Sequence, residues 1–538
     1  MASSPGNPEL AAALDEYAAL LDVSGANSYA TRAYRRAAGL IRETPVDVAA
    51  LVREGRVRRL RGIGPGIEQR LTELVETGRI AELDELRNSV SLELAAFGRM
   101  HGFTAKRFVD IGAALGIRTV VELRDAAERG RLREVPGIGP STEASILAAL
   151  DAPSVRPAGS LLLHQAREVC SRIAVALDGI AAGDTRRWVD TPARLAVVVA
   201  TDSPEDALAR FAELPEIVAL IGPSIGVTVD GTAVELVTTA PAELGTALVR
   251  ATGAPEYVAA LEPLPAVPDE ERLFRKIGLP YVPPELREER ASPPPVDLVE
   301  PADIRGDLHC HTTWSDGRAT VRQLAEAAIA RGYDYVAVCD HTTNVGVVPG
   351  LDADALRRQA EEVDAVNAEL APFRVLRGTE CNILPDGRLD LPDDVLAELD
   401  WVQISVHAGQ RTRRAELTAR VLHAMHHPSA RCLSHPTGRI IGHRPENRLD
   451  LERTIEAAIE TGVALEVNGL PSRLDLSGAH VSEAISAGVR IVCSSDAHSV
   501  AGLDSMLYAV HTARRGGAPR SAVLNTRELG ELLGTIER

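Results

Sequence analysis

Seven short apolar segments between residues 303 and 538 each end in side chains that are able to bind a metal ion. The segments are DLHCH, YVAVCDH, RVLRGTE, WVQISVH, RCLSH, ALEVN and RIVCSSDAH, and their polar ends are His309 and His311, Asp340 and His341, Glu380, His407, His435, Glu466 and Asn468, and Asp496 and His498. These groups follow one another at intervals of 27 to 40 residues, which is the length of one strand with one helix. The spacing predicts a parallel seven-stranded (β/α) barrel, with its chemistry at the carboxyl ends of the strands.

Imidazole nitrogens and carboxylate oxygens that meet at one barrel mouth are suitable ligands for Mn²⁺, Zn²⁺ or Fe²⁺. Since the set exceeds what one ion can use, we expect two or three divalent metal ions. Several close cations lower the pKa of a bridging water and stabilise both the attacking and the leaving oxygen of a phosphoester. The sequence therefore predicts a metal-dependent phosphoesterase, with a purely structural barrel as the alternative. The other histidines of this region are expected outside the site: His423, His426, His427, His443, His480 and His511.

The overall composition restricts the partners of the chain. Lys+Arg 58 against Asp+Glu 76 gives a net charge of −18, so any contact with nucleic acid requires a local basic patch. The sequence shows neither a signal-peptide pattern nor an uncharged apolar run near the ~20 residues that span a bilayer, which predicts a cytoplasmic protein without a membrane partner. The six cysteines have no paired spacing and are expected to be reduced thiols. A monomer is compatible with all of these features.

The first 155 residues have helical patterns and two Gly-rich turns, RGIGPGIEQRL at 61–71 and PGIGPSTEASIL at 136–147, with a less distinct third turn at 97–106. Each clear turn resembles a helix-hairpin-helix, in which glycine lets backbone N–H groups approach a DNA phosphate. The residues predicted to contact DNA are Gly62, Gly64, Gly66, Gly137 and Gly139, with Arg35 and Arg36 following the backbone. Helical hairpins that bind nothing and a solvated arginine face are the alternatives.

The middle of the chain alternates helix and strand patterns. Helices are predicted at 161–178 and 204–213, a strand at 195–200 and a strand pair between 226 and 238, which indicates a small α/β domain. The segment YVPPELREERASPPPVDLVEP at 281–301 is rich in proline and charge and predicts an extended linker. The predicted fold is therefore multidomain, with boundaries at 1–88, 89–156, 157–280, a linker at 281–302, and 303–538.

The last domain resembles a PHP (polymerase and histidinol phosphatase) domain in the motifs DLHCHTTWSDG (307–317), CDH (339–341), GTECNIL (378–384), SVHAG (405–409), SHPTGR (434–439) and SSDAHS (494–499). This resemblance implies three ions, the first held by His309, His311, Glu380 and Asp496, the second by Glu380, His407 and His435, and the third by Asp316, His341 and His498. It implies as nucleophile a metal-bridging hydroxide at Glu380, Asp496, His309 and His311. Arg439 and Arg473 are candidates for binding phosphate, with surface salt bridges as their alternative use.

The preceding residues resemble the N-terminal part of a bacterial family-X DNA polymerase. The similarity lies in ANSYATRAYRRAAGLI at 26–41, RLREVPGIGP at 131–140 and KIGLPYVPPELRE at 276–288, which leads into DIRGDLHCHT. The resemblance implies a polymerase-β-like helix-hairpin-helix domain at 1–88, a second such domain at 89–156, and a nucleotidyltransferase palm and thumb at 157–280. It also implies gapped or 3'-ended DNA as the partner and a role in DNA repair.

The palm departs from the pattern of that family, which has Gly-Ser, a double Arg, two carboxylates for the catalytic Mg²⁺ ions and a third carboxylate on a later strand. When GDTRRWVDTPARLAVVV (183–199) is aligned on its double Arg, Asp184 replaces the serine, and Arg194 and Ala196 replace the two aspartates. Glu235 is the candidate for the third carboxylate. A cation in place of a metal ligand reverses the sign of the interaction, so polymerase activity is predicted to be lost. A shifted alignment with Asp190 and Asp202 as ligands remains open.

The 5'-deoxyribose-phosphate lyase activity of related polymerases requires a lysine that forms a Schiff base. Gly66 and Arg70 occupy the corresponding positions, and the first lysine is Lys106, so this activity is predicted to be absent. These features together predict a 3'-5' exonuclease or 3'-end-processing nuclease that helix-hairpin-helix domains bring to DNA. Two alternatives remain: an active family-X polymerase with exonuclease activity, and a small-molecule phosphatase of the histidinol-phosphatase type.

Overall fold

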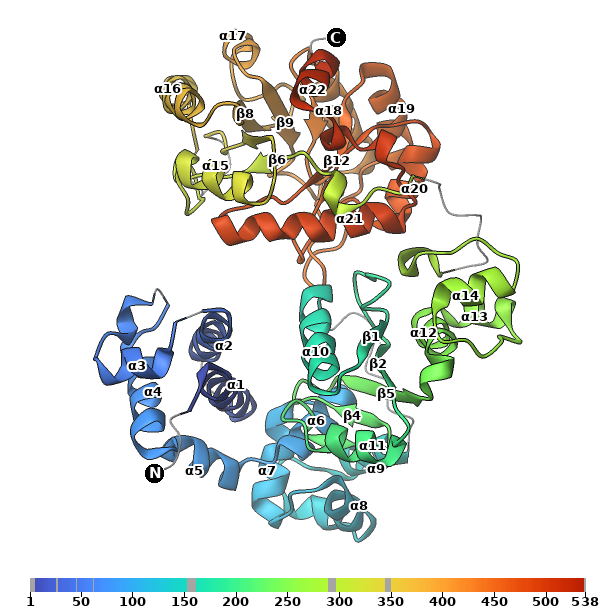
Figure 1. Cartoon of the computed structure of the whole chain (residues 1–538). Helices are drawn as coiled ribbons and strands as arrows, with labels where there is room; N and C mark the ends of the chain where they lie inside the picture. Colours follow the sequence, from blue (N-terminus) through green and yellow to red (C-terminus); the bar gives the residue numbers. More distant parts are fainter. Residues whose placement is uncertain are drawn as a thin grey trace. The chain divides into compact units, whose positions relative to one another are not determined.

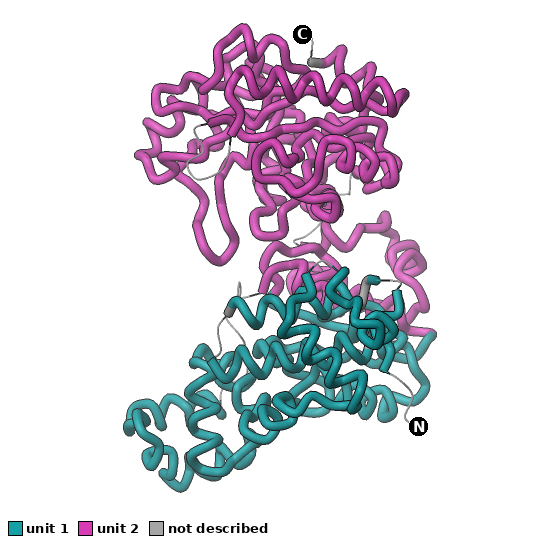
Figure 2. Tube along the Cα trace, turned by 90° about the vertical axis from the view of Figure 1, so that its left-hand side faces the viewer, with its two compact units in different colours: residues 1–158, 169–181, 193–241 teal, residues 159–168, 182–192, 242–538 magenta. Residues whose placement is uncertain are grey.

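The computed structural model describes residues 5–25, 28–44, 46–60, 62–151, 161–288, 297–343 and 350–536, and the chain divides into two compact units (Figure 2). Unit 1 comprises residues 1–158, 169–181 and 193–241, and unit 2 comprises residues 159–168, 182–192 and 242–538. The predicted boundary at 156 and the centre of the predicted linker lie outside the described residues. Among the described residues, every helix is too short or too polar to cross a membrane.

The described part of the first 151 residues is helical, as the pattern predicts. The helices are α1 (Asn7–Val23), α2 (Ser28–Glu43), α3 (Val48–Arg53), α4 (Pro65–Thr77), α5 (Ala81–Ser89), α6 (Leu92–Met100), α7 (Ala105–Leu115), α8 (Val120–Glu128) and α9 (Pro140–Asp151). The first five surround one apolar core that includes Leu14 and Leu71, and the last four surround a second core that includes Phe108 and Ile146. Two separate helical cores are therefore present.

The two Gly-rich turns have the same backbone form. Gly62 and Gly137 have φ angles of 111° and 84°, in the left-handed region that favours glycine. Helices α4 and α9 start three residues later, each with proline as its first helical residue. A Cβ atom at Gly64 or Gly139 would meet nothing within 4 Å, so the backbone before each helix is accessible. These features suit the close approach of an anion to the helix N-terminus.

The middle of the chain forms a mixed five-stranded sheet. Its strands are β1 (Ile180–Gly183), β2 (Leu195–Ala200), β3 (Ala219–Leu220), β4 (Ile225–Val227) and β5 (Ala233–Thr239), in the order β1-β2-β5-β4-β3. Strands β2 and β5 are parallel, and β4 pairs with β5 in the antiparallel direction. The helices of this region are α10 (Leu163–Ala176), α11 (Pro204–Ala212), α12 (Leu244–Thr252), α13 (Pro255–Leu261) and α14 (Glu270–Lys276). The predicted strand at 195–200 is confirmed.

The last part of the chain is a seven-stranded parallel barrel, which confirms the predicted fold class. The strands are β6 (Gly306–Cys310), β7 (Tyr335–Val338), β8 (Arg374–Asn382), β9 (Trp401–Ser405), β10 (Cys432–Leu433), β11 (Ala464–Asn468) and β12 (Ile491–Ser494). They follow sequence order around the sheet, from β6 to β12. A bridge between Cys310 and Ala497 brings the two ends together, and His311 N donates to Ala497 O over 2.8 Å.

Helices surround the barrel strands (Figure 1). They are α15 (Val321–Ala330), α16 (Ala353–Leu370), α17 (Asp393–Ala397), α18 (Arg414–Met425), α19 (Leu451–Thr461), α20 (Gly478–Ser486) and α21 (Met506–Arg515). The carboxylates of Asp352 and Asp450 cap the N-termini of α16 and α19, where backbone N–H groups lack helical partners. Leu308 and Trp401 pack inside the barrel with Leu532 of α22 (Leu529–Ile536), which leaves the carboxyl ends of the strands as the site for chemistry.

Part of the proline-rich segment is buried in the described structure, although its composition predicts an extended linker. Arg287 is fully buried, and its guanidinium donates to Glu270 at 2.6 Å and to the carbonyl of Val282 at 2.9 Å. Glu285 is also buried and accepts hydrogen bonds from His511 and Arg514 of α21, each at 2.7 Å. Buried ion pairs of this kind override the extended preference of a proline-rich chain, so Val282, Glu285 and Arg287 belong to the core of unit 2.

Residues 182–192 also pack within unit 2. Trp188 stacks on the imidazole of His511, with 3.7 Å between ring centroids and 5° between planes. The guanidinium of Arg167 lies 3.5 Å from the centroid of the Trp188 ring. Trp188 shares a small apolar core with Ile441 and Leu474 of the barrel. This segment, predicted as part of the palm, is therefore held by the barrel domain.

Replacing Glu285 with glutamine is expected to lower the stability of unit 2 by about 3 kcal/mol at neutral pH. Burial favours the neutral acid, but hydrogen bonds from His511 and Arg514 lower the pKa of Glu285 from 4.5 to about 2. Because the folded pKa is below the unfolded one, this stabilisation is present above pH 4.5 and is lost as the pH falls toward 2. Thermal unfolding of the wild type and the variant between pH 7.5 and pH 3 measures the difference in their stability. This difference in stability should become smaller as the pH falls, and a constant difference would contradict the assigned role of Glu285.

Candidate metal centre

The nine side chains predicted to hold metal ions lie at the carboxyl ends of the barrel strands or on the loops that follow them. His309 and Glu380 belong to β6 and β8, and the others follow strand ends: His311, Asp316, His341, His407, His435, Asp496 and His498. Parallel strands direct their carboxyl ends to one mouth, so residues up to 189 positions apart in the chain meet there. The structure thus brings together all nine predicted residues.

The donor atoms form three overlapping groups. The first contains His309, His311 and Asp496, the second His341, Glu380 and His407, and the third His311, Asp316, His341 and His498, with the ligand atoms of each group within 4.8 Å of one another. The sets predicted from the sequence differ in one respect. They place His341 only with Asp316 and His498, whereas the structure also places it with Glu380 and His407. His435 contacts the second group through Glu380, its Nε2 lying 2.9 Å from Glu380 Oε1.

Glu380 is the centre of this cluster. Its Oε1 lies 3.3 Å from His407 Nε2, and its Oε2 lies 2.9 Å from His341 Nδ1 and 3.6 Å from His309 Nε2. The carboxylate is buried, with 1% of the side chain exposed. One carboxylate with both oxygens directed at different imidazoles is suited to bridging two cations, which agrees with its place in two predicted ion sites.

Glu466 orients His309, a role that sequence reasoning did not assign. Its Oε1 lies 2.6 Å from His309 Nδ1 and accepts from Gln403 Nε2 at 2.7 Å, while its Oε2 accepts from the backbone N–H of His435 at 2.6 Å. When Nδ1 donates to a carboxylate, Nε2 is the free nitrogen for a metal ion, and this arrangement strengthens the ligand. The signal was present in the sequence, because ALEVN carries a carboxylate at a strand end.

Asp340 holds the loop that carries Asp316. Its carboxylate accepts hydrogen bonds from Thr312 N at 2.8 Å, Thr312 Oγ1 at 2.6 Å and Gln359 Nε2 at 2.6 Å. Its lone pairs are therefore used within the protein, in agreement with its omission from the predicted ligands. Asp340 fixes the backbone between His311 and Asp316 and so positions both.

Electrostatic interactions within the cluster hold its carboxylates ionised. Burial disfavours the charge of Glu380, but His407, His341 and His309 hold its pKa well below the usual value. Burial likewise disfavours a charged His498, yet Asp316 and Asp496 raise its pKa to about 9. Burial lowers the pKa of His311 to about 4, so this ring stays neutral at pH 7. Histidine protons thus supply the positive charge that the carboxylates require.

The donor chemistry fits divalent ions of the first transition row. The set consists of imidazole nitrogens and carboxylate oxygens, which Mn²⁺, Fe²⁺ and Zn²⁺ accept. The Nδ1 atoms of His311 and His407 are buried and have no hydrogen-bond partner among the described residues. A buried ring nitrogen without a partner is costly unless a ligand satisfies it. The residues therefore fit the predicted ions, whose identity remains a prediction.

Binding of Mn²⁺ at this cluster is expected to release protons at pH 7. His498 is protonated there because its pKa is about 9, and it must be neutral to act as a ligand. The apparent affinity should rise by up to about tenfold per pH unit between pH 7 and pH 9 for each proton released. Titration calorimetry in two buffers of different ionisation enthalpy measures the release. Heats that do not depend on the buffer would contradict this prediction.

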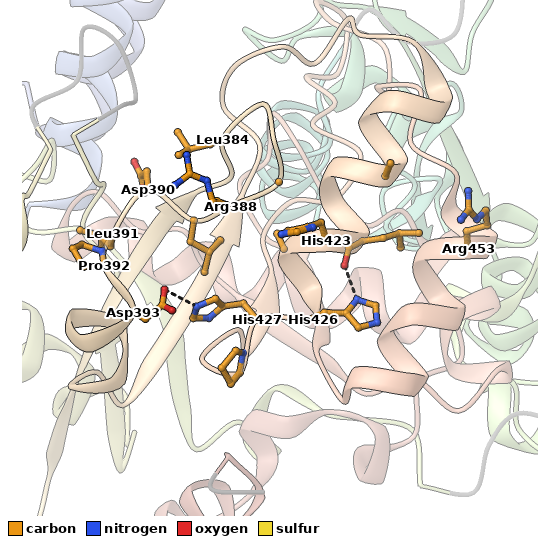
Figure 3. Close-up of a pocket in the computed structure, with 16 residues that line it drawn as sticks. Leu384, Arg388, Asp390, Leu391, Pro392, Asp393, His423, His426, His427 and Arg453 are labelled. Atoms are coloured by element: carbon orange, nitrogen blue, oxygen red, sulfur yellow. Dashed lines mark hydrogen bonds and ion pairs between the residues drawn. The ribbon is translucent and has the colours of Figure 1, made fainter.

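The histidines expected outside the site lie apart from these donor groups. His423, His426 and His427 line a separate cavity of about 990 Å³ between the loop around Arg388 and helix α18 (Figure 3). His427 Nε2 lies 3.4 Å from Asp393, and His426 Nδ1 lies 2.8 Å from the carbonyl of Leu422. Among the described residues they complete no group of three metal donors.

Comparisons with known proteins identify the family of the chain. Residues 5–80 match a helix-hairpin-helix domain, and residues 307–469 match a PHP domain. The chain is 32% identical over 562 aligned positions to the DNA polymerase/3'-5' exonuclease PolX of Bacillus subtilis (strain 168), with 98% of each chain covered. The chain belongs to the PolX family. This homology confirms the predicted family and the predicted class of enzyme, a phosphoesterase with a PHP domain.

Shorter matches connect the PolX chain to proteins named as probable phosphatases. One, from Acetivibrio thermocellus, is 32% identical over 202 residues, which are 36% of this chain and 78% of the relative. Another, from Syntrophotalea carbinolica, is 31% identical over 166 residues, which are 30% of this chain and 64% of the relative. The match to the PHP model ends at residue 469, so Asp496 and His498 are assigned from the structure and the motif alone.

The predicted palm of this PolX-family chain brings two positions that differ from the family pattern, Arg194 and Ala196, next to the candidate third carboxylate, Glu235. Ala196 of β2 is the register partner of Glu235 in β5. Arg194 directly precedes β2, and its Nη2 lies 3.2 Å from Glu235 Oε2. The remaining carboxylate is therefore paired with a cation. In unit 2, Asp184 is paired with Arg187, and Asp190 is paired with Arg439 at 2.7 Å, so Asp190 of the alternative alignment is also engaged.

The predicted phosphate ligands of the PolX barrel have different surroundings. Arg439 pairs with Asp190 and also donates from Nε to the carbonyl of Arg473 at 2.8 Å. It therefore forms a salt bridge, which was the alternative to phosphate binding. Arg473, by contrast, has a buried Nη1 atom without a hydrogen-bond partner among the described residues. Its role as a phosphate ligand remains a prediction.

The predicted DNA contacts of unit 1 lie on accessible elements. Arg36 is exposed on α2, and Arg35, also exposed, lies within 3.8 Å of Asp22 and 3.6 Å of Asp230. Gly66 lies in the first turn of α4, where a Cβ atom would lie 3.5 Å from the hydroxyl of Tyr34. Their contact with DNA remains a prediction.

Proposed function

We propose that this PolX-family protein is a metal-dependent 3'-5' exonuclease that trims DNA ends or gaps during repair, and that its palm does not synthesise DNA. The observation that carries the proposal is the set of nine imidazole and carboxylate side chains at one barrel mouth. The name of the Bacillus subtilis relative supports DNA as the substrate.

The residues of the chain supply the geometry for phosphodiester hydrolysis. When bound, divalent ions at this mouth supply a lowered water pKa and charge stabilisation for the attacking and leaving oxygens. Glu380 and Asp496 stay ionised and supply negative charge to the site. Glu466 keeps His309 in the tautomer with a free Nε2. Burial of these side chains excludes bulk water and strengthens each interaction.

The palm supports the second half of the proposal. Nucleotidyl transfer by two metal ions requires a cluster of carboxylates, but in this chain Glu235 faces Ala196 and pairs with Arg194. A guanidinium beside the one retained carboxylate repels a divalent cation. The helix-hairpin-helix turns at Gly62 and Gly137 retain the backbone geometry that suits phosphate binding, so the front part of the chain serves to bring DNA to the protein.

The test uses a 5'-labelled primer on gapped DNA with Mn²⁺, with and without deoxynucleotides, beside the double variant His309→Ala, His311→Ala. We expect the primer to shorten in both reactions and to remain intact with the variant. Extension with deoxynucleotides would show that other carboxylates hold polymerase metals. Shortening that persists in the double variant would assign the hydrolysis to another site or to a contaminant.

Hydrolysis of small phosphate monoesters is a second candidate, favoured by the similarity to proteins named as probable phosphatases. The same donor set is able to serve either substrate. Comparing kcat/KM for a single-stranded oligonucleotide with that for p-nitrophenyl phosphate separates the two functions, and we expect the oligonucleotide to be the better substrate.

A further inference from the structure

Three arginines lie on three successive loops at the barrel mouth, each four to nine residues beyond a side chain of the candidate metal centre. Arg411 follows His407 on the loop after β9, Arg444 follows His435 after β10, and Arg473 follows Glu466 after β11. These loops are neighbours because the three strands are neighbours in the sheet. The arginines therefore lie along one side of the mouth.

These three arginines have no ion-pair partner in the described parts of the chain, whereas other arginines of the same loops do. Arg413 pairs with Glu416, Arg414 with Asp450 at 3.1 Å, and Arg439 with Asp190 at 2.7 Å. Arg444 donates from Nε only to a backbone carbonyl, that of Gly438, at 2.8 Å. The Nη1 atom of Arg473 is buried and lacks any partner among the described residues.

Backbone and side-chain contacts join the three loops. The backbone N–H of Ile441 donates to the carbonyl of Ser472 at 2.8 Å, which joins the loops of Arg444 and Arg473. A Cβ atom on Gly438 would lie 3.3 Å from Gln410 Nε2, which places the residue before Arg411 against the second loop. Burial, and then the charges of Arg473 and Arg411, hold the pKa of Arg444 below its usual value, although the buried carboxylate of Asp475 acts in the opposite direction. Arg411 and Arg473 thus each lie close enough to Arg444 to repel it.

Like charges that lie close together are costly, and an anion that binds between them lowers this cost. Asp475 offsets only part of the repulsion, because the pKa of Arg444 stays below its usual value. The chain as a whole carries −18, so a local basic group at the mouth is a marked departure from the rest of the surface. A single phosphate is satisfied by one or two guanidiniums. A group spread over three loops, from exposed Arg411 to half-buried Arg473, matches a chain of phosphates better than a monoester.

We propose that Arg411, Arg444 and Arg473 bind successive backbone phosphates of single-stranded DNA whose 3' end lies at the His407–His435 side of the metal centre. This inference rests on the proposed function, because it assumes that DNA is the substrate. It makes the arginines positioning residues that determine a preference for polynucleotides over small esters.

The main test compares Arg411→Ala, Arg444→Ala in one chain with the charge-matched variant Arg374→Ala, Arg490→Ala. Arg374 is the first residue of β8 and Arg490 directly precedes β12, so both lie at the opposite end of the barrel. The readouts are KM for a 5'-labelled single-stranded oligonucleotide at several salt concentrations and the rate of hydrolysis of bis-p-nitrophenyl phosphate. We expect KM for the oligonucleotide to rise at least about tenfold in the mouth variant only, with unchanged hydrolysis of the small ester.

The salt dependence gives a second readout that a structural defect does not produce. Each lost phosphate contact lowers the slope of log affinity against log salt by about 0.7 for a single strand, so the double variant should lose more than one unit of slope. Arg411→Lys with Arg444→Lys should restore most of the affinity, since the charge is kept. Arg473→Met, tested separately because this side chain is partly buried, should raise KM for the oligonucleotide in the same way.

The outcomes separate the two proposals. If the wild-type protein hydrolyses the small ester but not the oligonucleotide, the proposed function fails, and this inference fails with it. If the wild-type protein degrades the oligonucleotide and the mouth variant does so with unchanged KM and salt slope, only the inference is overturned.

Discussion

Replacing Glu380 with glutamine is expected to reduce kcat/KM for DNA hydrolysis by about a thousandfold, which corresponds to about 4 kcal/mol of transition-state stabilisation. The two oxygens of Glu380 face different imidazoles, with contacts of 2.9 Å to His435 and 2.9 Å to His341. Glutamine keeps the volume but removes the charge with which Glu380 would hold two neighbouring cations. Gel assays with a 5'-labelled oligonucleotide and Mn²⁺ measure the loss.

The control for this variant is His423→Ala, which removes a histidine of the same domain from the separate cavity of Figure 3. It should keep activity within about twofold of the wild type. Metal content after dialysis should fall in the Glu380 variant and stay constant in the His423 variant. More than a tenth of the wild-type activity in Glu380→Gln would show that this carboxylate does not bridge the ions.

Removal of bound metal is expected to lower the melting temperature of the barrel domain by about 10 °C or more. Glu380, Glu466 and Asp496 are buried together, and protonated histidines compensate them only in part when no metal is present. An ion whose free concentration is about a thousand times its Kd stabilises the folded state by about 4 kcal/mol. For a domain of this size each kcal/mol shifts the melting temperature by about 2–4 °C.

Differential scanning calorimetry with and without a chelator measures this effect, and added Mn²⁺ should reverse it. The double variant His309→Ala, His311→Ala should show a smaller response to the chelator, since two ligands are missing. A melting curve of the wild type that is unchanged by the chelator would mean that the cluster holds no ion under these conditions.

The barrel and its mouth could be predicted from sequence because the relevant signals are local and repeated. Each strand is short, apolar and followed by polar residues, and the parallel topology then brings His309 and His498 together without further information. The turns at Gly62 and Gly137 could also be predicted from the sequence, because only glycine readily adopts the positive φ that they require.

The features that sequence reasoning missed depend on side-chain direction or on distant pairs. Glu466 resembles a ligand in the sequence, and only the 2.6 Å distance to His309 Nδ1 shows that it orients a ligand instead. The pair of Arg439 with Asp190 joins residues 249 positions apart, and no local pattern specifies it. The composition of the proline-rich segment describes the free chain and gives no sign that Arg287 is buried against Glu270.

The packing of Trp188 against His511, and of Glu285 against Arg514, determines how separable the barrel is. A fragment beginning at Asp303 would lack both Trp188 and Glu285. Arg514 would lose its buried acidic partner Glu285, and Ile441 and Leu474 would lose the apolar contact with Trp188. A chimera that replaces this barrel with a stand-alone phosphoesterase must therefore also replace residues 159–168, 182–192 and 242–302. The segment that can be exchanged as one piece is larger than the catalytic barrel.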